Sequence, residues 1–184
     1  MRRGLIRTAA WILGSLASLM VLFVVVGLAL PHTVEVTRSV TLDASPAEVF
    51  PHLDDLEAWT AWTPWGDVES HIEGNSRGTG ATRVWDDPNL GSGTLTITNV
   101  ATLRSVDYRA EVEGGLTFLG TLSVRPEGPG TSLVWTESVS WGMNPLMGWT
   151  GLTLGNAQGR QLEGSLDRLR RLVAGSNGPN PPGR

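Results

Sequence analysis

The sequence predicts an α+β domain in which a seven-stranded antiparallel sheet is covered by one long C-terminal helix, with a single transmembrane helix ahead of it. Three observations lead to this fold class. An uncharged apolar segment lies near the start of the chain, alternating apolar and polar residues fill its middle, and the periodicity changes to 3.6 residues near its end. The links between the alternating segments are short, which favours antiparallel pairing.

The N-terminal segment has the length and composition of a membrane span. Residues 9–30 are apolar, and no charged residue occurs between Arg7 and Glu35 if His32 is neutral. At about 1.5 Å per residue this helix would measure roughly 33 Å, enough to cross a hydrocarbon core of about 30 Å. Arginines precede it, so we expect residues 1–32 to be a single-pass anchor with a cytoplasmic N-terminus and an extracytoplasmic domain. A cleaved signal sequence is the alternative.

Charge and composition narrow the function of the rest of the chain. Three of the 14 arginines precede Thr33, so the remaining eleven face 18 acidic residues and leave a net charge of −7 from Thr33 onward. Such an acidic domain lacks the electrostatic footprint of a nucleic-acid-binding protein. The absence of cysteine excludes disulfides and thiol chemistry. We expect one domain over residues 33–174 and a disordered, glycine- and proline-rich tail over residues 175–184.

Seven segments have the alternation of strands, with turn residues between them. They are residues 34–42, 71–74, 81–85, 93–101, 105–113, 116–124 and 131–141. After the first strand, Ser45, Pro46 and Glu48 form a capping-box start for a helix that Pro51 must shorten or kink. A second short helix is expected over residues 56–62.

The final helix is predicted over residues 153–173, where apolar residues recur with a 3.6-residue period. Gly155, Gly159 and Gly164 lower its propensity by about 1 kcal/mol each, but they also permit close approach of another surface or a ligand. The apolar segment ahead of it, residues 142–152, is too rich in glycine for a helix to be predicted there.

Three tryptophans occur within seven residues, at Trp59, Trp62 and Trp65. The first two are three positions apart and would share one face of a helix. They can form an aromatic plug that fills one end of the core, or they can line a ligand pocket. Both interpretations can hold together, because a pocket wall is also part of the core.

One carboxylate lies in the apolar phase of a predicted strand. In residues 133–141 the other positions on the same face of the strand as Glu137 hold Leu133, Trp135, Val139 and Trp141. A charge there is costly unless it is paired, protonated or facing a cavity. We expect either a buried ion pair with Arg38 or Arg83, or a group that accepts a hydrogen bond from a ligand or acts as a general base.

The order of the predicted elements and three stretches of sequence resemble the SRPBCC superfamily, of the START-like, polyketide cyclase/dehydrase type. The stretches are VEVTRSVTLDASPAEVFPHLDDLEAWTAWTPW at residues 34–65, GTGATRVW at residues 78–85, and the late strand–loop–helix. The resemblance implies a helix-grip fold, in which a curved sheet wraps around the C-terminal helix and encloses an apolar cavity. Members bind lipids, sterols, polyketides or hormones, and a minority catalyse cyclisation or dehydration.

These observations predict a membrane-tethered domain that binds a hydrophobic small molecule or lipid between sheet and helix. The first alternative is a cyclase or dehydratase that uses Glu137 as acid and base. The second is an anchored interaction module whose core is filled by its own tryptophans. No cofactor is implied, and the spacing of His52, Asp54 and Asp55 is too loose to indicate a metal site. The expected lining of the cavity is Trp59, Trp62, Trp85, Tyr108, Phe118, Trp135, Glu137, Trp141 and Leu162.

Overall fold

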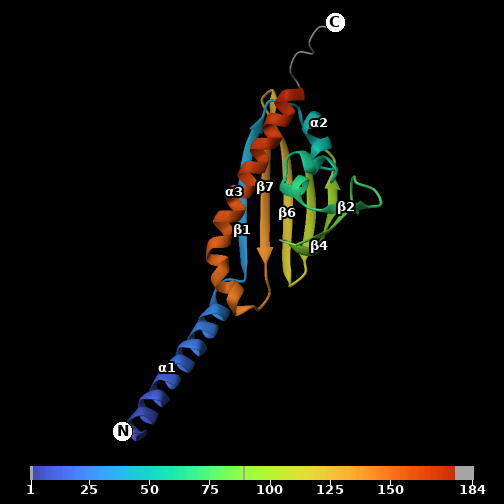
Figure 1. Cartoon of the computed structure of the whole chain (residues 1–184). Coiled ribbons are helices and arrows are strands. Elements are labelled where there is room, and N and C mark those ends of the chain that lie inside the picture. Colours follow the sequence, from blue (N-terminus) through green and yellow to red (C-terminus); the bar gives the residue numbers. More distant parts are fainter. Residues whose placement is uncertain (1, 89, 177–184) are drawn as a thin grey trace.

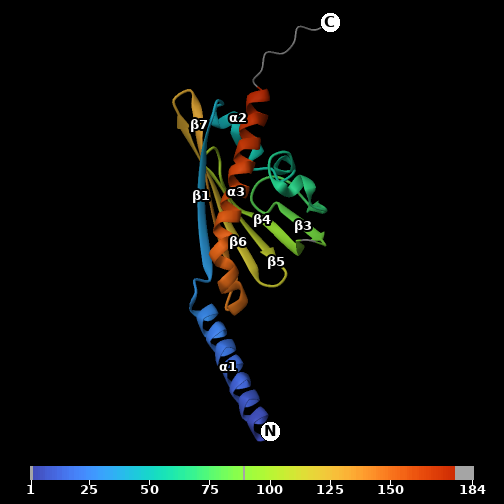
Figure 2. The ribbon, with the colours of Figure 1, turned by 60° about the vertical axis from the view of Figure 1, so that its left-hand side comes forward.

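The computed structural model describes residues 2–88 and 90–176, and it confirms the predicted fold class. A single seven-stranded antiparallel sheet curves around the long helix α3 (Pro145–Ser176), and the apolar helix α1 (Arg2–Ala29) projects from one end of the domain (Figures 1 and 2). Most of the predicted disordered tail, residues 177–184, lies outside the described residues, whereas residues 175 and 176 belong to α3.

All seven predicted strands are present, with ends that differ from the prediction by a few residues. The sheet order is β1-β7-β6-β5-β4-β3-β2, so the first strand of the domain pairs with the last and every other neighbouring pair is consecutive in the chain. The strands are β1 (Thr33–Leu42), β2 (Ser70–Glu73), β3 (Thr82–Asp87), β4 (Gly91–Ala101), β5 (Ser105–Val112), β6 (Leu116–Glu127) and β7 (Gly130–Ser140).

The segment between β1 and β2 forms short helical turns rather than long helices. Helix α2 (Pro46–Val49) ends before Pro51, as predicted, and is followed by three 3-10 turns, η1 (Phe50–His52), η2 (Ala58–Ala61) and η3 (Pro64–Asp67). The second predicted helix is therefore only the turn η2. Trp59 and Trp62 are nevertheless both buried, and their indole N–H groups donate to backbone carbonyls of the preceding segment, at 2.9 Å and 3.0 Å.

Helix α3 begins eight residues before the predicted start, at Pro145. No helix was predicted over residues 142–152 because the local cost of glycine was the only term weighed, but residues 145–152 are helical. The side chain of Asn144 accepts a hydrogen bond from the backbone N–H of Leu146 at 3.0 Å, which satisfies a free donor at the helix start. A side chain on Gly148 would collide with α1, and one on Gly151 would collide with the ring of Trp141.

The two helices make different contacts with the rest of the molecule. Helix α3 buries Leu162, Leu166, Leu169 and Val173 in the core of the domain. Helix α1 leaves its apolar side chains exposed along most of its described length and contacts α3 through its last turns. Its segment Trp11–Ala29, of 19 residues, is the one helix among the described residues that is long and apolar enough to cross a membrane.

Candidate ligand-binding pocket

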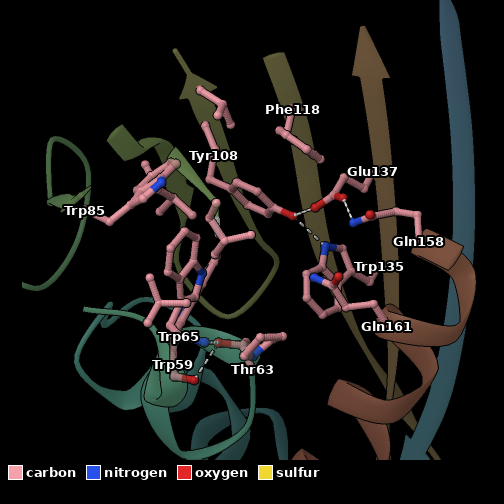
Figure 3. A pocket seen from close by; sticks show the side chains of 16 residues that line it. Trp59, Thr63, Trp65, Trp85, Tyr108, Phe118, Trp135, Glu137, Gln158 and Gln161 are labelled. Atoms are coloured by element: carbon pink, nitrogen blue, oxygen red, sulfur yellow. Dashed lines mark hydrogen bonds between the residues drawn. The ribbon is translucent and has the colours of Figure 1, made fainter. Parts of the chain in front are cut away.

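A cavity of about 310 Å³ lies between the sheet, the η turns and α3 (Figure 3). This volume is at the lower end of the range of small-molecule sites, roughly 300–1,000 Å³. The tryptophans of the core therefore do not fill the whole interior. The lining consists of Trp59, Thr63, Pro64, Trp65, Val68, Trp85, Leu90, Leu95, Tyr108, Ala110, Val112, Phe118, Trp135, Glu137, Gln158 and Gln161.

The pocket has a buried deep end and an accessible rim. Tyr108, Trp135 and Glu137 at the deep end are each about 5% exposed or less. Leu90, from the turn between β3 and β4, and Gln161, from α3, are exposed at the rim. The cavity therefore opens at the surface near this turn and α3.

Strand register explains how Tyr108 reaches Glu137 across an intervening strand. Tyr108 on β5 pairs with Gly120 on β6, and Gly120 pairs with Glu137 on β7. Because Gly120 has no side chain, the ring of Tyr108 lies over β6, where a Cβ atom would collide with it. The same arrangement places the indole ring of Trp85 over Gly93, its partner on β4.

Four polar groups form one hydrogen-bonded chain at the deep end (Figure 3). The indole N–H of Trp135 donates to the hydroxyl oxygen of Tyr108 at 2.9 Å, and the Tyr108 hydroxyl donates to one oxygen of Glu137. The side-chain amide of Gln158, from α3, donates to the other carboxylate oxygen. Neutral donors thus satisfy both oxygens of a carboxylate in an apolar pocket.

The predicted ion pair of Glu137 with Arg38 or Arg83 is not formed. Gly159 leaves room for Arg38 beside α3, and Arg38 binds Glu163 on that helix at 2.5 Å. Arg83 lies on β3, separated from β7 by three strands, and it donates to the hydroxyl of Ser70 and to the carbonyl oxygen of Leu56. Each arginine therefore has partners on its own side of the domain.

Burial sets the titration of the two groups at the deep end. It raises the pKa of Glu137, and the hydrogen bonds from Tyr108 and Gln158 oppose this rise. Burial also raises the pKa of Tyr108 well above its ordinary value, and the nearby charge of Glu137 adds to the effect. Tyr108 is therefore a neutral donor, while Glu137 can exchange a proton at a higher pH than an exposed carboxyl group does.

Six of the nine side chains predicted to line the cavity do so, namely Trp59, Trp85, Tyr108, Phe118, Trp135 and Glu137. The other three do not line it. Trp62 is fully buried and packs against Trp135 with ring centroids 5.5 Å apart, Trp141 packs against Gly151, and Leu162 is in the core.

Gln158, the second partner of Glu137, is not among the site residues predicted from the sequence. Gln158 lies four residues after Leu154 and four before Leu162, on the apolar stripe of α3. A polar residue within an apolar phase is the signal that identified Glu137, and it could have identified Gln158 as well. Among residues 2–88 and 90–176, no group of three or more His, Asp or Glu side chains is placed to hold a metal ion.

Residues 33–174 match the family of polyketide cyclase / dehydrase and lipid transport proteins, so the chain belongs to this family. No curated protein matches the chain in sequence.

Solved structures share the fold at low identity. An uncharacterized protein from Rhizobium leguminosarum is 20% identical, with 77% of this chain and 95% of that chain covered and a TM-score of 0.56. The hypothetical protein jhp0584 from Helicobacter pylori is 14% identical, with 76% and 88% covered and a TM-score of 0.61. CalU16 from Micromonospora echinospora is 18% identical, with 78% and 77% covered and a TM-score of 0.52.

Proposed function

We propose that this chain is a membrane-anchored protein that binds a hydrophobic small molecule or a lipid in the pocket between the sheet and α3. The observation that carries the proposal is an apolar cavity of about 310 Å³ that closes on one polar cluster. The aromatic walls supply apolar contact area, and such walls with a few placed polar groups are the usual build of a ligand site. Trp62 supports these walls through its ring contacts with Trp59 and Trp135.

The polar groups of the pocket indicate an amphiphilic ligand. Glu137 can accept a hydrogen bond from a ligand hydroxyl through a remaining lone pair. The indole N–H of Trp85 is buried and has no hydrogen-bond partner among the described residues, so a ligand acceptor at that position would satisfy it. A molecule with an apolar body and one or two neutral polar groups fits both positions.

Helix α1 supplies the anchor in this proposal. Its exposed apolar surface has no counterpart elsewhere in the described domain, and a bilayer is the environment that accommodates such a helix. The arginines before it favour a cytoplasmic N-terminus and an extracytoplasmic domain. Protease treatment of right-side-out and inverted vesicles from expressing cells tests this orientation. The domain should be digested in the former and protected in the latter.

Binding is tested with the full chain, purified in detergent from its own host. Native mass spectrometry should show a co-purifying apolar ligand, and the neutral dye Nile red should bind with increased fluorescence. Ala110→Leu, which adds atoms to a buried lining position, should remove most of the dye signal. Ala61→Leu makes the same change at an exposed position and should retain it. A bare protein that does not bind the dye would support the interaction module instead.

A second candidate function is catalysis of the cyclase or dehydratase type, favoured by the chain of hydrogen bonds that ends on Glu137. A carboxyl group with a raised pKa, linked to a tyrosine hydroxyl, is suited to donate and accept a proton. Glu137→Gln distinguishes the two functions. A binding protein should keep its ligand in this variant. An enzyme should no longer dehydrate or cyclise the ligand, and mass spectrometry and chromatography of the incubated ligand would reveal this change.

A further inference from the structure

The start of α3 is held against the end of α1. The rings of Phe23 and Trp149 stack with centroids 5.1 Å apart and an angle of 8° between their planes, and the indole N–H of Trp149 donates to the carbonyl oxygen of Phe23 at 3.2 Å. Gly27, one turn after Phe23, and Gly148, the residue before Trp149, allow the backbones to approach so closely that a Cβ atom on either would collide with the other helix. The two helices are therefore packed together at this point.

This contact lies inside the apolar span of α1. Phe23 precedes Ala29, the last residue of the span, by six residues, or about 9 Å of helix. If the span crosses a bilayer, as the proposed function requires, then Trp149 lies below the outer boundary of that span. Amphipathic segments that lie in the membrane interface enter it to a comparable depth, about 5–10 Å.

The composition of this segment suits that position. No charged residue occurs between Glu137 and Arg160, although the chain from Thr33 onward carries 29 charged residues and a net charge of −7. Met143 and Leu146 expose 78% and 63% of their surface, more than any other large apolar residue of the domain whose burial the structure describes. Trp149 adds an aromatic ring of the kind that is enriched at membrane interfaces.

The rim of the pocket lies at the same end of the sheet. Thr33, where α1 enters the domain, pairs with Ser140, and Ser140 pairs with Thr117 at the start of β6. The hairpin between β5 and β6 therefore lies at the end from which α1 departs (Figure 1), and the register places the hairpin between β3 and β4, which carries the exposed Leu90, at the same end of the strand ladder. The β4–β5 hairpin, with Leu103, lies at the opposite end.

We propose that residues 141–149 form a second membrane contact, in which Met143 and Leu146 insert into the leaflet nearest the domain. The contact is apolar rather than electrostatic, because the same end of the sheet carries the acidic residues Glu111 and Glu113. It fixes the domain upright on the bilayer with the rim of the pocket near the lipid, so that an apolar ligand passes between membrane and pocket with little exposure to water. The inference rests on the anchoring role proposed for α1.

Single-cysteine variants test this contact directly, since the chain has no cysteine of its own. The full chain is reconstituted in phosphatidylcholine vesicles with the dye NBD attached at Met143→Cys, Leu146→Cys, Leu103→Cys or Leu19→Cys, all exposed positions. The NBD fluorescence is then compared with that in vesicles whose lipids include phosphatidylcholine with a doxyl quencher on the acyl chain. Leu19→Cys lies within the proposed span and reports on the anchor, and Leu103→Cys reports on the far end of the domain.

The expected result is quenching at positions 143, 146 and 19 that exceeds the quenching at position 103 by about twofold or more. Equal, weak quenching at 143, 146 and 103 together with strong quenching at 19 would overturn the second contact and leave the anchor intact. Weak quenching at 19 would overturn the anchor and the inference with it. Strong quenching at 103 would show that the domain lies flat on the bilayer, which also contradicts the inference.

Discussion

In residues 160–176 of α3 the exposed positions carry mostly arginines and acidic residues, whereas in residues 145–159 they carry threonine, asparagine, alanine and leucine. The buried positions differ as well. The second half packs leucines and a valine into the core, and the first half places glycines against α1, Trp141, β1 and Arg38. One continuous helix thus has two kinds of surface.

The difference separates stability from function within one element. The second half is an ordinary amphipathic helix, with a charged face in water and an apolar stripe in the core. The glycines of the first half lower its helix propensity, but this half contacts α1 and places Gln158 in the pocket. We therefore expect changes in the second half to act on folding, and changes in the first half to act on the site and on the contact with α1.

The largest effect is expected from truncation of a core leucine in the second half. Leu169→Ala removes a fully buried side chain and should lower the free energy of unfolding by about 2–5 kcal/mol. Leu154→Ala in the first half, where the side chain is only half-buried, should cost about 1 kcal/mol. Urea unfolding of the full chain in detergent, followed by tryptophan fluorescence, measures both. Equal losses of unfolding free energy in the two variants would contradict the conclusion that the second half of α3 contributes more to stability than the first.

A smaller, pH-dependent effect is expected at Glu137. Folding raises the pKa of this carboxyl group, so the folded chain holds the proton more tightly than the unfolded chain does. The free energy of unfolding should therefore fall as the pH rises from the unfolded pKa through the higher folded pKa, by about 1.4 kcal/mol for each unit of difference. Glu137→Gln should remove this fall.

Gln158, the partner of Glu137 in the first half of α3, provides a second test of this pH dependence. Gln158→Leu removes a hydrogen bond that lowers the pKa of Glu137, so the total fall in the free energy of unfolding should become larger and extend to higher pH. Glu111→Gln, at an exposed position outside the pocket, is the control and should leave the slope unchanged. Denaturant titrations at a series of pH values distinguish these variants. If the free energy of unfolding of Glu137→Gln fell with pH as it does in the unchanged chain, a titratable group other than Glu137 would be responsible for the fall.

The fold could be predicted because its signals are local. Each strand carries its own alternation, the final helix carries its own period, and the breaks at Pro51 and at the glycine-rich turns mark the ends. The start of α3 could not be predicted in this way. Its glycines are unfavourable in isolation, and only the contacts of Gly148 and Gly151 with other elements explain why the helix extends through them.

The site could be predicted in part for a related reason. A carboxylate in an apolar phase identifies Glu137 from sequence alone, but its partners depend on strand register and on the placement of α3. Charge complementarity suggested an arginine, whereas a glycine at position 120 allows Tyr108 to reach the carboxylate instead. A glycine in the apolar phase of a strand therefore deserves the same scrutiny as a charge in that phase, because it can admit a large side chain from the next strand.

The contact between α1 and the first half of α3 should be disrupted by Gly148→Val with little change in domain stability. The new side chain would collide with the backbone of α1 near Gly27, so α1 must move away. The free energy of unfolding should change by less than about 1 kcal/mol, because the core leucines of α3 are untouched. Spin labels at Ser18→Cys and Ala157→Cys should report a broader distance distribution. Gly14→Val, where a Cβ atom meets no neighbour, should leave that distribution narrow.

The smallest effect is expected where the two halves of α3 meet, at the ion pair between Arg38 and Glu163. Both side chains are partly exposed, at 35% and 55%, so solvent screens their attraction. Glu163→Gln should lower the free energy of unfolding by less than about 1 kcal/mol, and the loss should shrink further at high salt. A loss comparable with that of Leu169→Ala would mean that Arg38 depends on Glu163 to remain satisfied beside Gly159. In that case the close approach of β1 to α3, rather than the leucine stripe alone, would hold the helix on the sheet.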